Sequence, residues 1–443
     1  MAYTGLMSRE AYFKNKRIAV IGLGNHGEMV EDIKYLIKAG AFVSVYDLKS
    51  EARIKNHLIF LRSIGLANYV CGSIPSEDLL DMDLIILSHE YDKKANFLRD
   101  IQVPIEYPET LFFKQAPPVT VIGVMGECGK STVVSILSSI MEIACSPKND
   151  QKSFVLDPDS NKGILSSLKK IKSGDIVIIR ITDYISKELY NMRISPQISI
   201  YASLPSKHSY DKSPFEILSY QTYNNFIIGS DEIIDNIRSY NIQPKAKMIR
   251  TRLTTIPKDW DFNGFTIVQN KEKLALILEI VSLFKIDFDD VEKVLNNWKW
   301  QKGRMEFIKK VKNIGFYNDS FSVNPKSTEF AIKNLSLNRN AILIFGGADL
   351  GNSYSDLYKI MPSYVHTLVL IPGSGTIKER LKIMDIKDLD IKSAPSIEEA
   401  VRIAMDSAKK GDVIIFSPGF GSVGIDGSRK ERGEKFIKAV RAL

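Results

Sequence analysis

The stretch GVMGECGKSTV, residues 123–133, decides the fold of the central part of this chain. It follows the apolar segment VTVI and precedes VSILSSIMEIA, a pattern that predicts a buried strand, a glycine loop and a helix. Gly126 and Gly129 would let backbone N–H groups approach phosphate oxygens at the positive end of that helix. Lys130 can reach the terminal phosphates. The segment therefore predicts a nucleotide-binding loop, shorter than the usual G-x-x-x-x-G-K-[ST].

The bulk composition narrows the class of protein. The chain has 443 residues, 44% hydrophobic and 25% charged, as expected for a globular protein of two or three domains. It contains no apolar run of membrane-spanning length and no signal-peptide core at its N-terminus, so we expect a cytoplasmic protein with no membrane partner. The net charge of +8 comes from lysines spread along the chain, which argues against nucleic acid. The three cysteines and five histidines are scattered and predict neither disulfides nor a His-based metal cluster. We expect a monomer.

Three segments each alternate strands and helices, which is typical of α/β domains with parallel sheets. We place the domains at residues 1–114, 115–301 and 302–443. The first and third are predicted to be Rossmann-like. The second, with its glycine loop, is predicted to be P-loop ATPase-like with a mostly parallel sheet.

The first domain contains a second glycine turn, IGLGNHG. Gly22, Gly24 and Gly27 give G-x-G-x-x-G after a predicted strand, and Asp47 closes the next strand at the place of a ribose contact. Taken alone, this turn is compatible with an NAD-linked dehydrogenase or with a plain tight turn. A dehydrogenase would leave the loop at Lys130 and the third domain unexplained.

The order of these parts resembles the Mur ligase family over essentially the whole chain, and within it the branch that adds D-glutamate (MurD). Four segments of the third domain carry the resemblance in order: GRMEF (303–307); YNDS (317–320) with Asn324; FGGAD (345–349); and SPGFGS (417–422) followed by ERGEKF (431–436). The resemblance implies an ATP-dependent ligase. Such an enzyme phosphorylates the carboxylate of UDP-N-acetylmuramoyl-L-alanine, and D-glutamate then attacks the acyl phosphate to form an amide bond in peptidoglycan precursor synthesis.

The resemblance also assigns roles to residues. Those of the catalytic centre are Lys130 and His208, and we add Arg180, which departs from the family pattern and could take over part of a metal ion's charge-neutralising work. The ATP site, with Mg²⁺, is formed by Gly126, Gly129, Lys130, Ser131, Thr132, Asn270, Arg304 and Asp319. The metal ligands are Ser131 (or Thr132) and His208. The UDP-linked muramoyl substrate is bound by Gly24, Asn25, Asp47 and Leu48, and D-glutamate by Ser422.

The departures from the family pattern fall at the positions that carry out catalysis in the family. Arg180 stands where the family has a metal-binding glutamate, and Tyr223 or Asn224 falls where it has a carbamylated lysine. Lys207, Phe321, Leu350 and the pair Glu127-Cys128 are further departures. Because anionic oxygen donors are lost, we expect no second Mg²⁺, and we expect Glu127 to pair with Arg180. The alternative is a degenerate homologue that binds nucleotide or UDP-sugar in a regulatory or scaffolding role.

Overall fold

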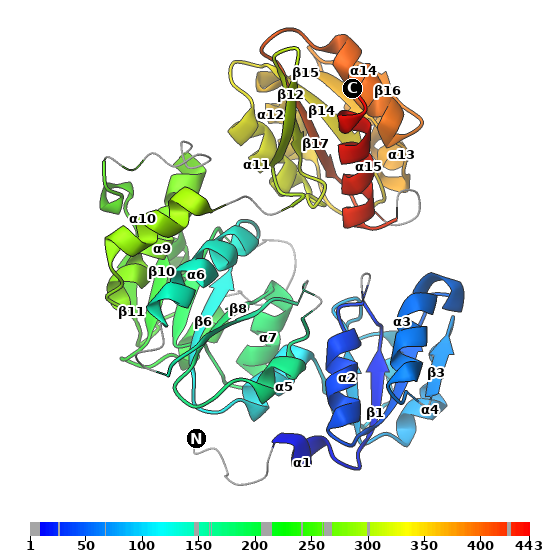
Figure 1. Ribbon diagram of the computed structural model, residues 1–443, viewed down its shortest axis with the longest axis vertical. Helices are drawn as coiled ribbons and strands as arrows, with labels where there is room; N and C mark the ends of the chain where they lie inside the picture. Colours follow the sequence, from blue (N-terminus) through cyan, green and yellow to red (C-terminus); the bar gives the residue numbers. More distant parts are fainter. Residues whose placement is uncertain are drawn as a thin grey trace. The chain divides into compact units, whose positions relative to one another are not determined.

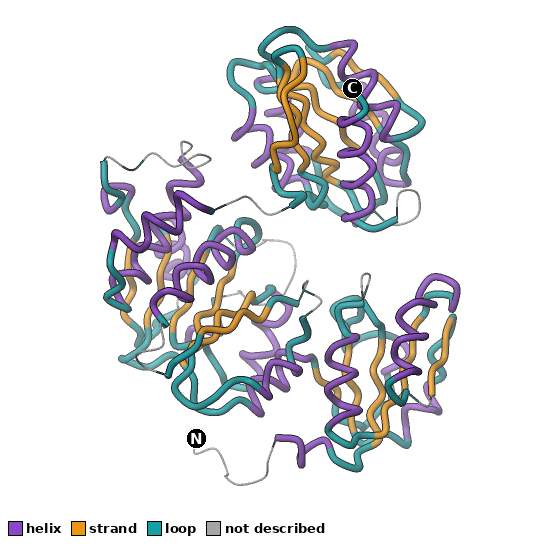
Figure 2. Tube along the Cα trace, viewed as in Figure 1, coloured by secondary structure: helices purple, strands orange, loops and turns teal. Residues whose placement is uncertain are grey.

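A computed structural model describes most of the chain (Figures 1 and 2). The described residues are 9–24, 27–66, 68–145, 150–158, 160, 162–204, 215–240, 242–258, 260, 268–298, 302–422 and 427–443. They form two compact units, one of residues 1–265 with 270–296 and one of residues 266–269 with 297–443. The first unit contains two sheets and the second contains one. No helix of the described residues is long and apolar enough to cross a membrane.

The first sheet has the strand order β3-β2-β1-β4-β5, and all its pairs are parallel. Its strands are β1 (Arg17–Ile21), β2 (Phe42–Asp47), β3 (Asn68–Cys71), β4 (Leu84–Leu87) and β5 (Ile105–Glu106). The helices are α1 (Arg9–Phe13), α2 (Val30–Lys38), α3 (Glu51–Ser63), α4 (Ser76–Leu80), η1 (Asn96–Leu98) and α5 (Pro108–Gln115). The central strand β1 is apolar beyond its first residue, because helices cover both faces of such a sheet. The strand order changes direction between β1 and β4, which places a ligand crevice beyond the carboxyl end of β1.

The second sheet has the order β11-β10-β9-β6-β8-β7 and is also parallel throughout. Its strands are β6 (Thr120–Met125), β7 (Ser153–Leu156), β8 (Ile176–Arg180), β9 (Ile198–Tyr201), β10 (Phe226–Gly229) and β11 (Lys247–Arg250). The helices are α6 (Lys130–Ala144), η3 (Leu165–Lys169), α7 (Asp183–Asn191), η4 (Glu216–Tyr220), α8 (Asp231–Ser239), η5 (Leu253–Thr255), α9 (Val268–Leu283) and α10 (Phe288–Asn297). The loop of residues 126–129 leaves the sheet at the carboxyl end of β6, which lies between β9 and β8.

The third sheet has the order β12-β13-β17-β14-β15-β16. Its strands are β12 (Glu306–Val311), β13 (Ile314–Asn318), β14 (Ala341–Gly346), β15 (Val365–Leu370), β16 (Asp390–Ser393) and β17 (Val413–Gly419). The helices are α11 (Pro325–Leu335), α12 (Ser355–Ile360), η6 (Met361–Ser363), α13 (Ser374–Met384), α14 (Ile397–Ser407) and α15 (Arg429–Arg441). Only β12, at the edge, runs antiparallel to its neighbour β13 among the described pairs. Apolar side chains pack on both faces of this sheet in two separate clusters.

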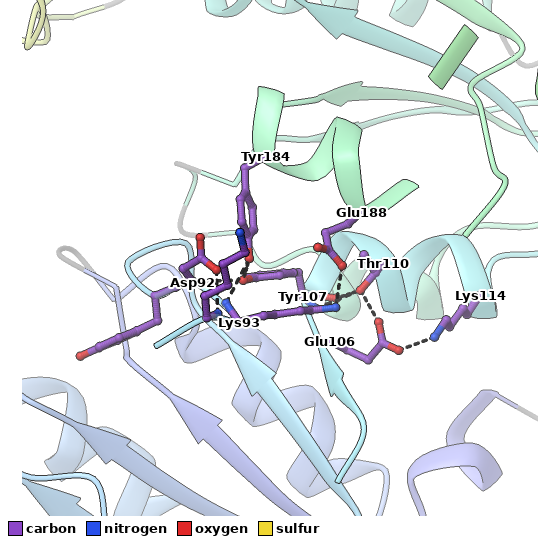
Figure 3. Close-up of polar contacts among 10 residues, drawn as sticks. Asp92, Lys93, Glu106, Tyr107, Thr110, Lys114, Tyr184 and Glu188 are labelled. Carbon is purple, nitrogen blue, oxygen red and sulfur yellow. Dashed lines mark hydrogen bonds and ion pairs between the residues drawn. The ribbon is translucent and has the colours of Figure 1, made fainter. Parts of the chain in front are cut away.

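Polar contacts join the first two sheets within the first unit. The Asp32 carboxylate on α2 accepts the N–H groups of Ile164 and Ser166, both at 3.0 Å, and so caps the start of η3. Asp32 is 2% exposed, and burial raises its pKa to about 7. A second cluster lies between β5–α5 and α7 (Figure 3). There the ammonium of Lys93 lies 2.6 Å from Glu188, and the hydroxyls of Tyr107 and Tyr184 meet.

These findings confirm the predicted fold class of three α/β domains with mostly parallel sheets. The predicted limits of the domains stay predictions. Helix α5 continues to Gln115, one residue beyond the predicted end of the first domain. The antiparallel strand β12 was not foreseen, because its alternating EFIKKV segment is half-buried at an edge.

Candidate nucleotide-binding site

The loop between β6 and α6 has the backbone geometry that its glycines permit. Gly126 and Gly129 have φ values of +113° and +84°, a region that side chains with a Cβ rarely adopt. A Cβ on Gly126 would also lie 2.5 Å from the carbonyl oxygen of Ser203. Glycine is therefore required at Gly126 by both backbone conformation and space.

The segment that follows β9 holds this loop in place. The N–H of Glu127 donates to the carbonyl of Leu204 at 3.1 Å, and the N–H of Cys128 donates to the Ser203 hydroxyl at 3.0 Å. Gly129 stands at the N-cap of α6, and no side chain of the described residues caps the start of that helix. An uncapped helix start behind a glycine loop suits an anion such as a phosphate group. The described residues of the loop therefore fit the phosphates of a nucleotide.

Lys130 begins α6 and folds back over its own loop. Its ammonium donates to the carbonyl of Gly126 and, at 3.1 Å, to the carbonyl of Glu127. Ser131 and Thr132 follow in the first turn of the helix and are half-buried. Hydroxyl oxygens in this position suit Mg²⁺, which prefers oxygen ligands.

Arg180 lies at the same edge of the sheet. It ends β8 and pairs in register with Val124 of β6, two residues before the loop. Its side chain is buried, and its Nε lies 2.7 Å from Oδ1 of Asp157, which follows β7. The predicted pairing of Arg180 with Glu127 stays a prediction. Arg180 thus places a cation at the end of this strand, and Asp157, which follows the neighbouring strand, pairs with it.

The glycine turn of the first domain is built around Asp47. Gly22, Gly24 and Gly27 all have positive φ. The Asp47 carboxylate is fully buried and accepts the N–H of Leu23 at 2.9 Å, and it lies 3.6 Å from the ammonium of Lys49. Asp47 therefore stabilises the turn by accepting this N–H group. Its contact with a substrate stays a prediction.

Leu48, the next residue, has an exposed side chain, at 50% of its full area. It follows β2 at the carboxyl edge of the first sheet, where the fold places a ligand crevice. An exposed leucine beside this turn is compatible with the predicted contact to the UDP part of a substrate.

In the second unit, Asp319 is a buried hydrogen-bond acceptor. It accepts the N–H of Met305 at 3.1 Å and the hydroxyls of Ser322 and Ser417 at 2.5 and 2.7 Å. Burial raises the pKa of Asp319 to about 6. The half-buried Arg304 lies close enough to lower that pKa in part. The ATP contacts predicted for Asp319 and Arg304 stay predictions.

Arg432, in α15, stabilises the loops near Ser422. It is 1% exposed and donates to the carbonyls of Ser320 and Phe420, each at about 3 Å. Ser422 itself is half-buried and follows the segment that Arg432 holds. Sequence reasoning matched the Arg-Gly pair at 432–433 to a family motif but gave it no role.

Several predicted site residues fall outside the described part of the structure. Asn25 and His208 are among them, and the side chain of Asn270 is not described either. Tyr223 is described and is 72% exposed. Within the described ranges, no group of three His, Cys, Asp or Glu residues could hold a metal ion.

Lys273 is a residue of this region that the sequence did not suggest. It belongs to α9, is 5% exposed, and lies against Gly129 of the loop. Nothing in the local sequence NKEKLALI marks it among the many lysines of the chain. Only the packing of α9 against the loop brings this lysine to Gly129.

The second parallel sheet thus carries a glycine loop that fits phosphate, and a third α/β sheet follows it along the chain. Comparisons with known proteins show what this chain is similar to. The family described as "Mur ligase, glutamate ligase domain" matches residues 303–420. The UDP-N-acetylmuramoylalanine–D-glutamate ligase of Clostridioides difficile is 27% identical, and the alignment covers 97% of this chain and 99% of that enzyme. The enzyme of the same name from Borreliella burgdorferi (strain ZS7) is also 27% identical, with 97% and 98% covered.

Solved structures show the same fold. The UDP-N-acetylmuramate–alanine ligase MurC of Thermotoga maritima gives a TM-score of 0.61 at 16% identity, covering 97% of this chain and 100% of that one. MurF ligase of the same organism, in complex with ADP, gives 0.54 at 14% identity, covering 98% and 97%. The chain is thus similar along its whole length to D-glutamate-adding Mur ligases in sequence and to Mur ligases in fold.

Proposed function

We propose that this protein is an ATP-dependent ligase that joins D-glutamate to UDP-N-acetylmuramoyl-L-alanine in peptidoglycan precursor synthesis. The observation that carries the proposal is the similarity to enzymes of that name along the whole chain, together with a glycine loop that fits phosphate. ATP would phosphorylate the substrate carboxylate, and the amine of D-glutamate would displace phosphate from the acyl phosphate.

The side chains of the loop supply charge and position for phosphoryl transfer. Lys130 would leave the carbonyls of Gly126 and Glu127 and bind the terminal phosphates. One Mg²⁺ would arrive with ATP and bind Ser131 or Thr132, whose hydroxyls are hard oxygen donors. Arg180, whose charge Asp157 offsets in part, would contribute a cation at the end of β8 to neutralise the transferring phosphoryl group.

The substrates are assigned to separate places. Gly24, Asn25, Asp47 and Leu48 are proposed to form the UDP site at the first sheet. Ser422 is proposed to contact D-glutamate, and Arg304, Asp319 and Asn270 are proposed to contact ATP. His208 is proposed as a metal ligand or a hydrogen-bonding residue. We expect the protein to act as a monomer.

One assay tests the proposal directly. Phosphate release is measured with ATP, Mg²⁺, UDP-N-acetylmuramoyl-L-alanine and D-glutamate, and each component is omitted in turn. We expect release only in the complete mixture, with one phosphate for each amide bond formed. Nucleotide binding without any phosphate release would instead identify a degenerate homologue, an alternative that the full-length similarity does not favour.

A further inference from the structure

Helix α13 of the second unit, labelled in Figure 1, carries three large apolar side chains on its outer surface. Ile377, Leu381 and Met384 are 74%, 81% and 54% exposed. Residues three or four apart are neighbours on a helix surface, so these side chains form one row along the helix. Glu379 and Ile383 are buried on its inner face. Single exposed apolar residues are common, whereas a contiguous row indicates an interaction surface.

A pocket opens beside this row. It has a volume of about 200 Å³ and lies between the first turns of α13 and the carboxyl ends of β15 and β16. Most of its lining is apolar and comes from Leu370, Ile371, Pro372 and Ala394. Ile377 and Arg380 of α13 line it as well. Because Ile377 belongs to both, the row and the pocket form one continuous surface.

The positive charges of α13 differ in their partners. Lys378 lies 2.6 Å from Asp349, and Lys382 lies 3.0 Å from Glu379, so both ammonium groups are balanced. Arg380 is exposed at the pocket, and no acidic residue of the described chain forms an ion pair with it. The guanidinium of Arg380 is therefore left for a partner that carries negative charge.

We propose that the row and its pocket are a docking site for an acidic amphipathic helix of a partner protein. The apolar face of that helix would lie along Ile377, Leu381 and Met384, with one large side chain in the pocket. A carboxylate of the same helix would pair with Arg380. Arginine and an apolar side chain held in a pocket are frequent anchors of protein interfaces. Asp385, the exposed acid of α13, follows Met384 at the end away from the pocket.

A second copy of this chain suits the surface less well. A stable protein interface commonly buries about 800 Å² on each partner, and three side chains beside one small pocket cover much less. A short helix in a transient complex matches this area better. The inference goes beyond the proposed ligase activity and uses no residue of the nucleotide-binding loop.

The test is fluorescence anisotropy of a labelled synthetic peptide titrated with the full chain. The peptide is an amphipathic helix with Leu at spacings of three and four residues and Glu on its other face. A matched peptide carries Lys in place of every Glu. We expect the acidic peptide to bind with a Kd of about 100 μM or tighter, and the basic peptide to bind at least about tenfold more weakly.

Substitutions at exposed positions separate the apolar contribution from the charged one. Leu381→Glu should weaken binding of the acidic peptide at least about tenfold, because it places a carboxylate in the centre of the apolar row. Arg380→Gln should weaken binding about threefold or more and reduce its dependence on salt. Leu337→Glu is the control, because Leu337 is 75% exposed and lies between α11 and β14, at the amino edge of the same sheet. It should bind as the wild type does.

The outcomes decide the matter. Binding of the acidic peptide that is unchanged within about twofold in Leu381→Glu would overturn the proposal. Equal binding of the two peptides, or no binding of the acidic peptide at about 1 mM, would overturn it as well. Sedimentation equilibrium tests the other occupant: a dimer that Leu381→Glu dissociates would assign the surface to a second copy. A failed ligation assay would remove the proposed function and leave this inference standing, because the peptide measurements do not depend on it.

Discussion

Arg180 and Asp157 form an ion pair across the carboxyl ends of the neighbouring parallel strands β8 and β7, with 2.7 Å between Nε and Oδ1. The side chains are 10% and 20% exposed, so water screens the pair poorly. An arginine here neither binds a metal nor stands uncompensated. It places a guanidinium together with its acidic partner at the edge of the sheet from which the glycine loop of residues 126–129 departs.

Breaking this pair should destabilise the first unit. Arg180→Met removes the guanidinium that pairs with the half-buried carboxylate of Asp157, and we expect the free energy of unfolding to fall by about 3 kcal/mol. Urea denaturation measures the change. Arg250→Met is the matched control in the same sheet, because Arg250 pairs with the largely exposed Asp231 and Asp235 and should cost less than about 1 kcal/mol. Equal losses in the two variants would contradict the prediction.

Lys130→Ala should weaken ATP binding by more than about tenfold, or about 1.4 kcal/mol. The variant removes the ammonium that now rests on the carbonyls of the loop and that is placed to move onto phosphate. Calorimetry with ATP and Mg²⁺ measures the affinity. Lys152→Ala, at an exposed lysine before β7, is the control. Unchanged affinity in Lys130→Ala would show that this loop does not hold the nucleotide.

Two adjacent residues of the first domain should respond differently to truncation. Asp47→Ala removes a buried acceptor of the Leu23 N–H and should lower the free energy of unfolding by about 2 kcal/mol. Leu48→Ala should leave stability unchanged and weaken binding of the UDP-linked substrate, because its side chain is exposed at the predicted site. Denaturation and calorimetry separate the two effects. A nicotinamide absorbance change with any hydroxy acid would contradict the uridine assignment.

At most one Mg²⁺ should enter the catalytic centre, carried by ATP. A cation at position 180 cannot replace an anionic oxygen donor for a hard metal. Crystals grown with Mn²⁺, a non-hydrolysable ATP analogue and the UDP-linked substrate would reveal the metals by anomalous scattering. Arg180→Glu should not raise the ligation rate. Two metals about 4 Å apart, the usual spacing of a two-metal site, would contradict this prediction.

The buried Asp32 should make stability depend on pH. Burial raises its pKa in the folded protein from 3.8 to about 7, so the folded state binds more protons than the unfolded chain between these values. The contribution to stability is fully present below pH 4 and is lost as the pH rises to 7, by up to about 4 kcal/mol. Asp32→Asn should lack this loss in urea denaturation from pH 4 to 8. Asp100→Asn, at an exposed position, is the control and should retain the loss of stability. Parallel pH profiles for Asp32→Asn and the wild type would contradict the prediction.

The helices and strands that depend only on neighbouring residues could be predicted from the sequence. Helix α6 begins at Lys130 and ends at Ala144, as its pattern after the glycine loop indicates. The roles that depend on distant segments were not predictable. Nothing near Arg180 identifies Asp157 as its partner, because pairing follows from the order in which β7 and β8 enter the sheet.

The same limit applies at the first glycine turn and at α9. By analogy, the aspartate at the end of β2 predicts a contact with a ribose. In the structure the Asp47 carboxylate accepts the N–H of Leu23, because the folded glycine turn points that group toward it. Lys273 resembles every other lysine until the helix is packed on Gly129. The periodicity of apolar residues along the chain predicts helices and strands, whereas the partners of charged side chains follow from tertiary packing.

The cap that Asp32 gives to η3 has a consequence for cooperativity. A protein cut after Gln115 would expose this carboxylate on one fragment and leave the N–H groups of Ile164 and Ser166 without their acceptor on the other. The aromatic contact of Tyr107 with Tyr184 would be lost as well. The two parallel sheets of the first unit should therefore melt in a single calorimetric transition, and fragments produced separately should be less soluble than fragments produced together.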